Sequence, residues 1–311
     1  MAVHEHRLTK YTRMAFFIQA SLSLFFCLLF FIFISCKKNL RTTRCNQVFL
    51  NILLIHILFN ISTVSAEINA PGDFQCIAVH NAYFLALVTG LSILCIERIL
   101  LVKFPAKHRR INDDFTSAVL IFSWAPCILF LCVELIDEKH HIRHLITFRV
   151  VIVSLGEILM LSLSCTIYKL AIKYDTFVKE HTALPQQSER MVSVCSLCIS
   201  AVVSCSILWL PLLVADMLVL EWMIPVEFVY PIQHFTPLNA LVHIFLFVYL
   251  SSDFRQELKD FFKGAREYLF TAFWPRAPEI LSLESLWFRE PNNHSIVNNI
   301  DYKFPRTEAY V

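Results

Sequence analysis

The sequence predicts an all-α membrane protein, a seven-transmembrane helix bundle followed by a short amphipathic cytosolic eighth helix. Of the 311 residues, 57% are apolar and only 17% are charged, which is more apolar surface than a soluble core of this length can bury. The apolar residues fall into seven runs of about 20 residues or more, the length that crosses a bilayer as a helix. The runs lack the two-residue alternation of barrel strands, so the sequence favours helices over a barrel.

The seven runs divide the chain into a membrane domain and two flanking segments. In chain order the runs cover 14–35, 46–66, 79–102, 115–136, 147–173, 191–220 and 226–250. The first run is too long for the apolar part of a signal peptide, and Lys37 and Lys38 follow it directly instead of a small-residue cleavage site. We therefore expect residues 1–13 to form an extracellular N-terminus and residues 14–250 to form the seven-helix domain.

Basic residues in alternate loops predict the orientation. The first, third and fifth loops are rich in lysine and arginine, whereas the loops between them hold few. Because cytosolic loops carry the positive charge, the N-terminus is predicted to lie outside and the C-terminus in the cytosol. The predicted location is the plasma membrane, with multiple passes.

The segment after the seventh run predicts a helix on the membrane surface. Residues 251–266 place Phe254, Leu258, Phe261 and Phe262 on one apolar stripe. We expect an amphipathic eighth helix there, in contact with membrane lipids, and a cytosolic tail over 267–311.

Charge and cysteine usage exclude several other classes. A formal charge of +2 gives no nucleic-acid footprint, and no metal-ligand or catalytic spacing is present, so we expect no enzyme, no metal and no cofactor. Most of the eleven cysteines lie within the apolar runs, where a thiol is usually a small apolar side chain. Cys76 and Cys132 alone lie at outer ends, and a disulfide between them needs Cα atoms within about 7 Å.

The motifs at the ends of the runs resemble those of one receptor family. Glu97 and Arg98 end the third run, Pro105 follows seven residues after the arginine, and the sixth run carries Trp209 two residues before Pro211. These residues resemble the rhodopsin-like (class A) G-protein-coupled receptors, and the resemblance extends over nearly all the spans. Further matching residues are Leu40-Arg41-Thr42, Asn51, Trp124, Tyr168 and Asp253-Phe254-Arg255.

The resemblance implies an activation switch that carries an extracellular ligand's signal to a heterotrimeric G protein. It implies that Glu97 holds Arg98 at rest and that Arg98 enters the G-protein cavity on activation, with Tyr168 in the same switch. Pro211 lacks an N–H to donate, so the sixth helix should kink there and pivot, with Trp209 as the transmission point. Two simpler interpretations stay open: Arg98 reaches the inner headgroups, and Trp209 is a core aromatic.

Several residues depart from the family pattern. His56 stands where the family has an aspartate, and His243, Ile244 and Phe247 stand where it has Asn-Pro-x-x-Tyr, so we expect no sodium site. We hypothesise that His56 and His243 hydrogen-bond to each other, with Asn239 as a third partner. A neutral imidazole pairs one donor with one acceptor, so the pair can satisfy itself without charge. Two separately satisfied histidines are the alternative.

The outer half of the bundle is the predicted ligand site, because convergent polar groups in a helical bundle define the default pocket. His80 stands where amine receptors carry an aspartate and Pro237 where opsins carry lysine, so monoamine and retinal ligands are not expected. One hypothesis is that Glu157 and Asp216 bind a cationic small molecule or peptide. Another is that His80 and the outer-loop histidines together make the receptor pH-responsive, and the simplest is that the charged outer loop is only solvated. The candidate ligand residues are His80, Phe84, Glu157, Leu212, Asp216, Tyr230, Gln233 and His234, and the outer-loop histidines are His140, His141 and His144.

Two further expectations concern signalling. Met191 occupies the site of a frequent acidic partner for Arg98, which predicts a loose lock and appreciable basal activity. A poorly coupling or decoy receptor is one alternative function, and a transporter or channel is another. A transporter or channel is expected to have inverted repeats and helices broken by glycine. The chain has only four glycines, which argues against broken helices.

Overall fold

The computed structural model describes residues 2–69, 73–104, 108, 113–136, 142–181, 185–223, 232 and 236–273. Nearly all of these residues are α-helical and none of them forms a strand, which confirms the all-α prediction. The chain divides into two units, Met1–Gln256 and Glu257–Val311. All the apolar helices belong to the first unit.

Five helices of the described chain contain stretches long and apolar enough to cross a membrane. They are α1 (Ala2–Cys36), α3 (Arg44–Asn69), α4 (Asp73–Lys103), α8 (Ile142–His181) and α9 (Pro185–Leu220). Two shorter apolar stretches, Ala118–Cys132 and Leu238–Leu250, belong to α6 (Asp113–Phe122), α7 (Ala125–Ile136) and α11 (Leu238–Leu250). The structure is therefore that of a multi-pass membrane protein.

The distribution of side chains supports a bilayer as the solvent. Large apolar side chains face outward along α1, α8 and α9, among them Phe25, Ile158 and Ile207. Meanwhile the interior holds buried histidines, asparagines, arginines and an aspartate. Because a soluble protein shows the opposite arrangement, the apolar exterior is suited to lipid.

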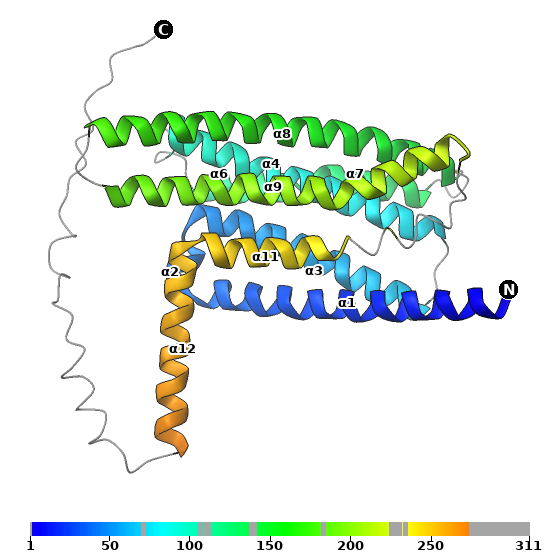
Figure 1. The fold of residues 1–311 in the computed structure, drawn as a ribbon, viewed down its shortest axis with the longest axis horizontal. Helices are drawn as coiled ribbons and strands as arrows, with labels where there is room; N and C mark the ends of the chain where they lie inside the picture. The colour runs from blue at the N-terminus through cyan, green and yellow to red at the C-terminus, as the bar shows by residue number, and fades with distance from the viewer. Residues whose placement is uncertain are drawn as a thin grey trace, which may run out of the picture. The chain divides into compact units, whose positions relative to one another are not determined.

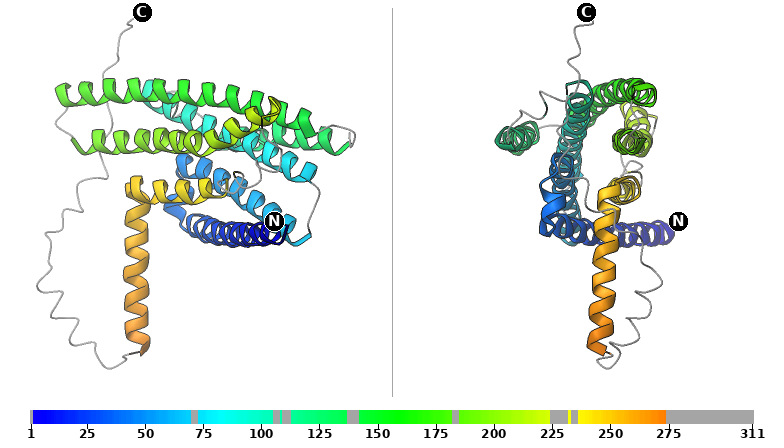
Figure 2. Two further views of the ribbon diagram at one scale, coloured as in Figure 1. Left: turned by 45° about the vertical axis from the view of Figure 1, so that its right-hand side comes forward. Right: turned by 90° about the vertical axis from the view of Figure 1, so that its left-hand side faces the viewer.

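Helix α4 lies at the centre of the packing. It contacts α3, α7, α8 and α9, while α8 packs on α9, α9 on α11, and α11 on α1. Figures 1 and 2 show α1, α8, α9 and α11 running along a common direction. At Gly156 on α8 an added Cβ would lie 3.1 Å from Val88 of α4, so the missing side chain permits this close approach.

The predicted run 115–136 is broken into two helices. The backbone turns at Ser123 and Trp124, between α6 and α7, and the Ser123 hydroxyl donates a 2.6 Å hydrogen bond to the Leu120 carbonyl. Pro126 then lies in the first turn of α7, where its missing N–H costs least. An apolar run measures length but does not reveal such a break.

Helix α9 continues through Pro211 without ending. Figure 1 shows α9 changing direction in its C-terminal part, as the kink prediction requires. The helix ends in a Schellman cap, in which Met223 N–H donates to the Leu218 carbonyl at 2.9 Å. Trp222 takes the left-handed position of that cap, with φ of 59°.

The ends of three predicted segments differ from the structure. Helix α1 begins at Ala2, so residues 2–13, predicted as a separate N-terminus, are helical and continuous with the first span. A short helix, α2 (Lys38–Arg41), follows α1, and α12 (Ser252–Phe273) extends beyond the predicted 251–266. The Phe254 N–H donates to Ser251 Oγ at 3.4 Å, which makes Ser251 the N-cap of α12.

Candidate functional site

The C-terminal end of α4 holds a buried ion pair between neighbouring residues. Arg98 Nε lies 2.7 Å from Glu97 Oε2, and the two side chains are 6% and 12% exposed. Their contact is not aligned as a hydrogen bond, because consecutive helix residues point about 100° apart. On its other oxygen, Glu97 lies 3.0 Å from His108 Nε2. The carboxylate is therefore shared between Arg98 and His108.

Buried thiols surround the Arg98 guanidinium. Cys45 of α3 and Cys195 and Cys198 of α9 all interact with it electrostatically. All three cysteines are free and buried, so the arginine has uncharged but polarisable neighbours on two adjacent helices.

A chain of hydrogen bonds crosses the middle of the bundle. His56 Nε2 of α3 lies 3.0 Å from His243 Nδ1 of α11, so the structure contains the bond hypothesised between these histidines. Tyr83 of α4 bonds to His56 Nδ1 at 2.9 Å, and His243 Nε2 bonds to the Ala201 carbonyl of α9 at 3.2 Å. The chain thus joins four helices.

The chemistry of the terminal acceptor fixes the direction of every bond in this chain. The Ala201 carbonyl can only accept, so His243 Nε2 must donate to it. A neutral His243 then accepts at Nδ1, which requires His56 Nε2 to donate. His56 Nδ1 accepts in turn from the Tyr83 hydroxyl. Every ring nitrogen is satisfied with both imidazoles uncharged.

Neither of the two asparagines predicted for the polar core bonds to the histidines. The Asn239 side chain has no hydrogen-bond partner in the described part of the chain, so the third partner of the histidines is Tyr83 instead. Asn51 faces the break between α6 and α7, where Trp124 Nε1 donates to its Oδ1 at 2.9 Å and Asn51 Nδ2 donates to Ser123 Oγ at 3.4 Å. Asn51 therefore positions the fourth apolar segment.

Trp209 lies above the histidine chain in an aromatic cluster. Its ring centroid is 4.5 Å from Phe84 and 6.0 Å from Tyr83, and it is 2% exposed. Its indole N–H has no acceptor among the described residues. Tyr168, the other predicted switch residue, is 58% exposed because it lies off the buried stripe of α8, so the structure does not bring it to Arg98.

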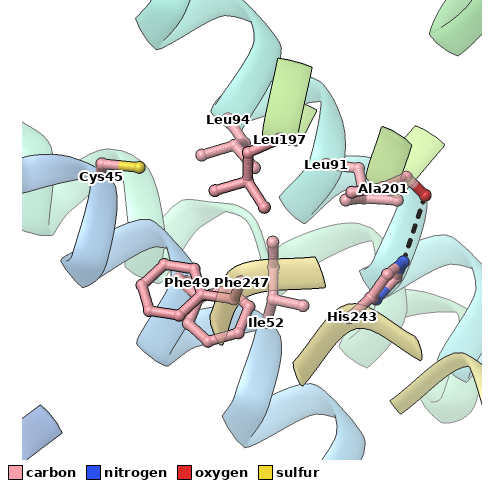
Figure 3. Close-up of a pocket in the computed structure, with 9 residues that line it drawn as sticks. All are labelled: Cys45, Phe49, Ile52, Leu91, Leu94, Leu197, Ala201, His243 and Phe247. Carbon is pink, nitrogen blue, oxygen red and sulfur yellow. Dashed lines mark hydrogen bonds between the residues drawn. The ribbon is translucent and has the colours of Figure 1, made fainter. Parts of the chain in front are cut away.

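An apolar pocket lies between α3, α4, α9 and α11 (Figure 3). In Figure 3 the Cys45 thiol lies at one end, and His243 with its bond to Ala201 lies at the other. Phe247 stacks on Phe49 with centroids 3.8 Å apart, where the family motif would place a tyrosine hydroxyl. The lining residues are Cys45, Phe49, Ile52, Leu91, Leu94, Leu197, Ala201, His243 and Phe247.

A second arginine–acid pair joins Arg149 of α8 to Asp216 of α9. The Arg149 Nε donates to Asp216 Oδ2 at 2.6 Å and its Nη2 donates to the other carboxylate oxygen. Both side chains are 1% exposed. Asp216 was predicted to bind a cationic ligand, but its charge is already neutralised bidentately by Arg149, so the pair cannot provide that cation site unaltered.

The second predicted acid also has a partner inside the protein. The Ser206 hydroxyl of α9 donates to Glu157 Oε2 of α8, and Glu157 Oε1 is buried without a partner in the described chain. Glu157 thus lies in the α8–α9 interface. The two carboxylates bind neighbouring helix residues rather than converging with His80 on one open pocket.

The remaining predicted site residues are partly placed. His80 is buried with its ring edge-on to Phe59 at 5.0 Å, Leu212 is buried, and His144 is exposed. Cys132 is an exposed free cysteine, so the structure does not contain the predicted bridge from Cys132 to Cys76. Tyr230, Gln233, His234, His140 and His141 also lie outside the described residues.

Sequence reasoning missed three residues of these networks. Arg149 lies near the start of the predicted run 147–173 and was not singled out, yet its four-residue spacing from Leu145 and Val153 indicates the buried face of a helix. Tyr83 carries a hydroxyl inside an apolar run, which calls for a buried partner. His108 lies in a basic loop, and no local pattern marks its contact with Glu97.

Comparison of the sequence with models of protein families and with curated proteins finds no match. Within the described residues, no group of three or more histidine, cysteine or acidic side chains is arranged to hold a metal ion.

Proposed function

We propose that the protein is a rhodopsin-like G-protein-coupled receptor with seven transmembrane helices. In this proposal α6 and α7 together make the fourth span, α11 makes the inner part of the seventh, and α12 lies on the cytosolic membrane surface. The N-terminus is extracellular and the C-terminus cytosolic, in the plasma membrane. An extracellular ligand then drives nucleotide exchange on a heterotrimeric G protein.

The position of Arg98 is the observation that supports the proposal most strongly. It is buried at the end of the central helix, and its ion pair lies within α4 rather than across to α9. Helix α9 carries a proline inside its length and can therefore bend without breaking its other hydrogen bonds. An outward tilt of the inner half of α9 would uncover Arg98 to a cytosolic partner.

Guanine-nucleotide exchange in membranes tests the proposal. Because Met191 replaces an acidic lock partner, we expect wild-type membranes to stimulate exchange on a promiscuous G protein without ligand, above mock-transfected membranes. Arg98→Ala and Pro211→Ala should each abolish this signal at matched surface expression, while Lys38→Gln, an exposed inner lysine, should leave it intact. Full signal in both variants would contradict the proposal.

A decoy receptor that couples poorly is the second candidate, and the stacked Phe49 and Phe247 rings favour it. Their centroids are 3.8 Å apart and nearly parallel at 4°, so α3 and α11 are joined by apolar contact where relatives place a hydroxyl. A decoy would bind its ligand without any exchange. Phe247→Tyr would then raise exchange from background, whereas a coupling receptor already signals before the substitution.

A further inference from the structure

The apolar face of α12 is covered at its start and exposed further along. Phe254, in the first turn, is fully buried, and its ring lies against those of Phe30 and Phe247, with centroids 5.5 and 5.2 Å away. Two turns later, Phe261 and Phe262 are 47% and 61% exposed. Exposed aromatic side chains that lie together on one helix mark a surface that another molecule covers.

The charged residues of α12 are sorted by sign along its length. Because successive helix residues point about 100° apart, the basic residues fall into one row beside the apolar face and the acidic residues into another row on the opposite flank. The basic row is Arg255, Lys259, Lys263 and Arg266, and the acidic row is Asp253, Glu257, Asp260 and Glu267. Lys259, Lys263 and Arg266 are exposed and form no ion pair within the described chain.

This arrangement of charges is unfavourable for a helix surrounded by water. Like charges four residues apart on a helix repel each other, whereas opposite charges at that spacing attract. Arg255, Lys259 and Lys263 follow one another at that spacing, although α12 has as many acidic as basic residues with which to form attractive pairs. A row of like charges is stabilised instead by a surface of the opposite charge. The basic row therefore fits an extended anionic partner, and the exposed phenylalanines beside it fit one that also offers hydrocarbon.

We propose that α12 binds anionic phospholipid headgroups along its basic row, with Phe261 and Phe262 inserted among the acyl chains. This inference rests on the proposed position of α12 at the cytosolic membrane surface, and it adds the class of lipid that this surface must contain. Lysine and arginine side chains are long enough to reach headgroup phosphates while their stems cover apolar surface. Because the acidic row lies on the other flank, α12 can roll about its axis so that the basic row approaches the headgroups and the acidic row stays in water.

Hydrogen–deuterium exchange of the full-length protein tests this lipid preference. The protein is reconstituted at one copy per nanodisc, in discs of phosphatidylcholine alone and in discs in which one third of the lipid is phosphatidylserine. Peptide mass spectrometry gives the exchange rate of the backbone amides, with peptides from α4 as the internal reference. We expect the amides of 257–268 to exchange several-fold more slowly in the discs that contain phosphatidylserine. Salt at about 1 M should remove this difference, because the Debye length then falls to about 3 Å.

Two matched double variants separate the roles of the two charged rows. Lys259→Gln/Lys263→Gln removes half of the basic row and should abolish the difference in hydrogen exchange between the two kinds of disc. Asp260→Asn/Glu267→Gln removes half of the acidic row, also at exposed positions, and should keep or increase the difference. Each variant loses two charges from α12, so a general loss of helix stability would appear in both.

Equal hydrogen exchange in the two kinds of disc, or an unchanged difference in Lys259→Gln/Lys263→Gln, overturns the proposal. A difference that appears only with two copies per disc also overturns it, because the basic row would then bind the acidic row of a second copy. The measurement needs no G protein, so a chain that stimulates no nucleotide exchange leaves this test intact. Conversely, equal hydrogen exchange in the two kinds of disc leaves the proposed signalling function standing.

Discussion

The two buried arginine–acid pairs differ in how they connect the helices. Arg149 and Asp216 belong to two helices, α8 and α9, and bind through two parallel hydrogen bonds with side chains that are 1% exposed. Arg98 and Glu97 are neighbours within α4, their contact is poorly aligned, and Glu97 also contacts His108. The Arg149–Asp216 pair fastens one helix to another, whereas the Arg98–Glu97 pair does not.

The difference teaches where α9 is held and where it can move. Asp216 anchors the segment of α9 after Pro211 by an ion pair, whereas the segment before it is held by hydrogen bonds, from His243 to the Ala201 carbonyl and from Ser206 to Glu157. Pro211 lies between these two sets of contacts. Under the proposed mechanism the segment of α9 after Pro211 stays fixed, the helix bends at Pro211, and the segment before it tilts.

Breaking the Arg149–Asp216 pair should have the largest effect on stability. Asp216→Asn leaves a buried arginine without its counter-charge and should lower the free energy of unfolding by about 3–5 kcal/mol. Thermal unfolding of the detergent-purified protein measures this. The double variant Arg149→Met/Asp216→Leu replaces the pair with apolar side chains and should recover most of the loss. Equal stability of Asp216→Asn and the wild type would show that the pair does not hold α8 to α9.

Interrupting the histidine chain should have an intermediate effect. His56→Ala and His243→Ala each leave a buried polar group without its partner and should lower the free energy of unfolding by about 1–3 kcal/mol. Because both changes break the same bond, the double variant should cost less than the sum of the two. Unfolding of all four proteins in a double-mutant cycle gives the coupling energy. Strict additivity would mean that the two histidines are independently satisfied.

Weakening the Arg98–Glu97 pair should change stability least, but it should clearly change ligand-free nucleotide exchange. Glu97→Gln removes a charge whose contact with Arg98 is poorly aligned and lies within one helix, and it should alter the unfolding free energy by only about 1 kcal/mol, the low end for a buried polar group. A bias of that size between two states corresponds to roughly fivefold in population, so ligand-free nucleotide exchange should rise several-fold. Glu97→Asp keeps the charge and is the matched control. Unchanged exchange in Glu97→Gln would remove Glu97 from the switch.

The sequence contained much of the fold and only part of the site. Apolar run length predicts helices directly, since the bilayer sets it, and α3, α4, α8 and α9 all overlap their predicted runs. The His56–His243 bond could be predicted because two histidines replaced residues that face each other in the resembling family. The Arg149–Asp216 pair could not, since it depends on how α8 and α9 rotate about their axes. The predicted bond of Asn239 to the histidines was wrong for the same reason.

The directed bonds from Tyr83 to Ala201 have a consequence for how the middle of the bundle responds to disturbance. Each group donates only because the next group accepts, so removing any one bond takes away the reason for the orientation of the others. The three hydrogen bonds, which link four helices, are therefore expected to form and break together. A displacement of α9 at Ala201 would reach the Tyr83 hydroxyl of α4 through the two imidazoles, without any charge having moved.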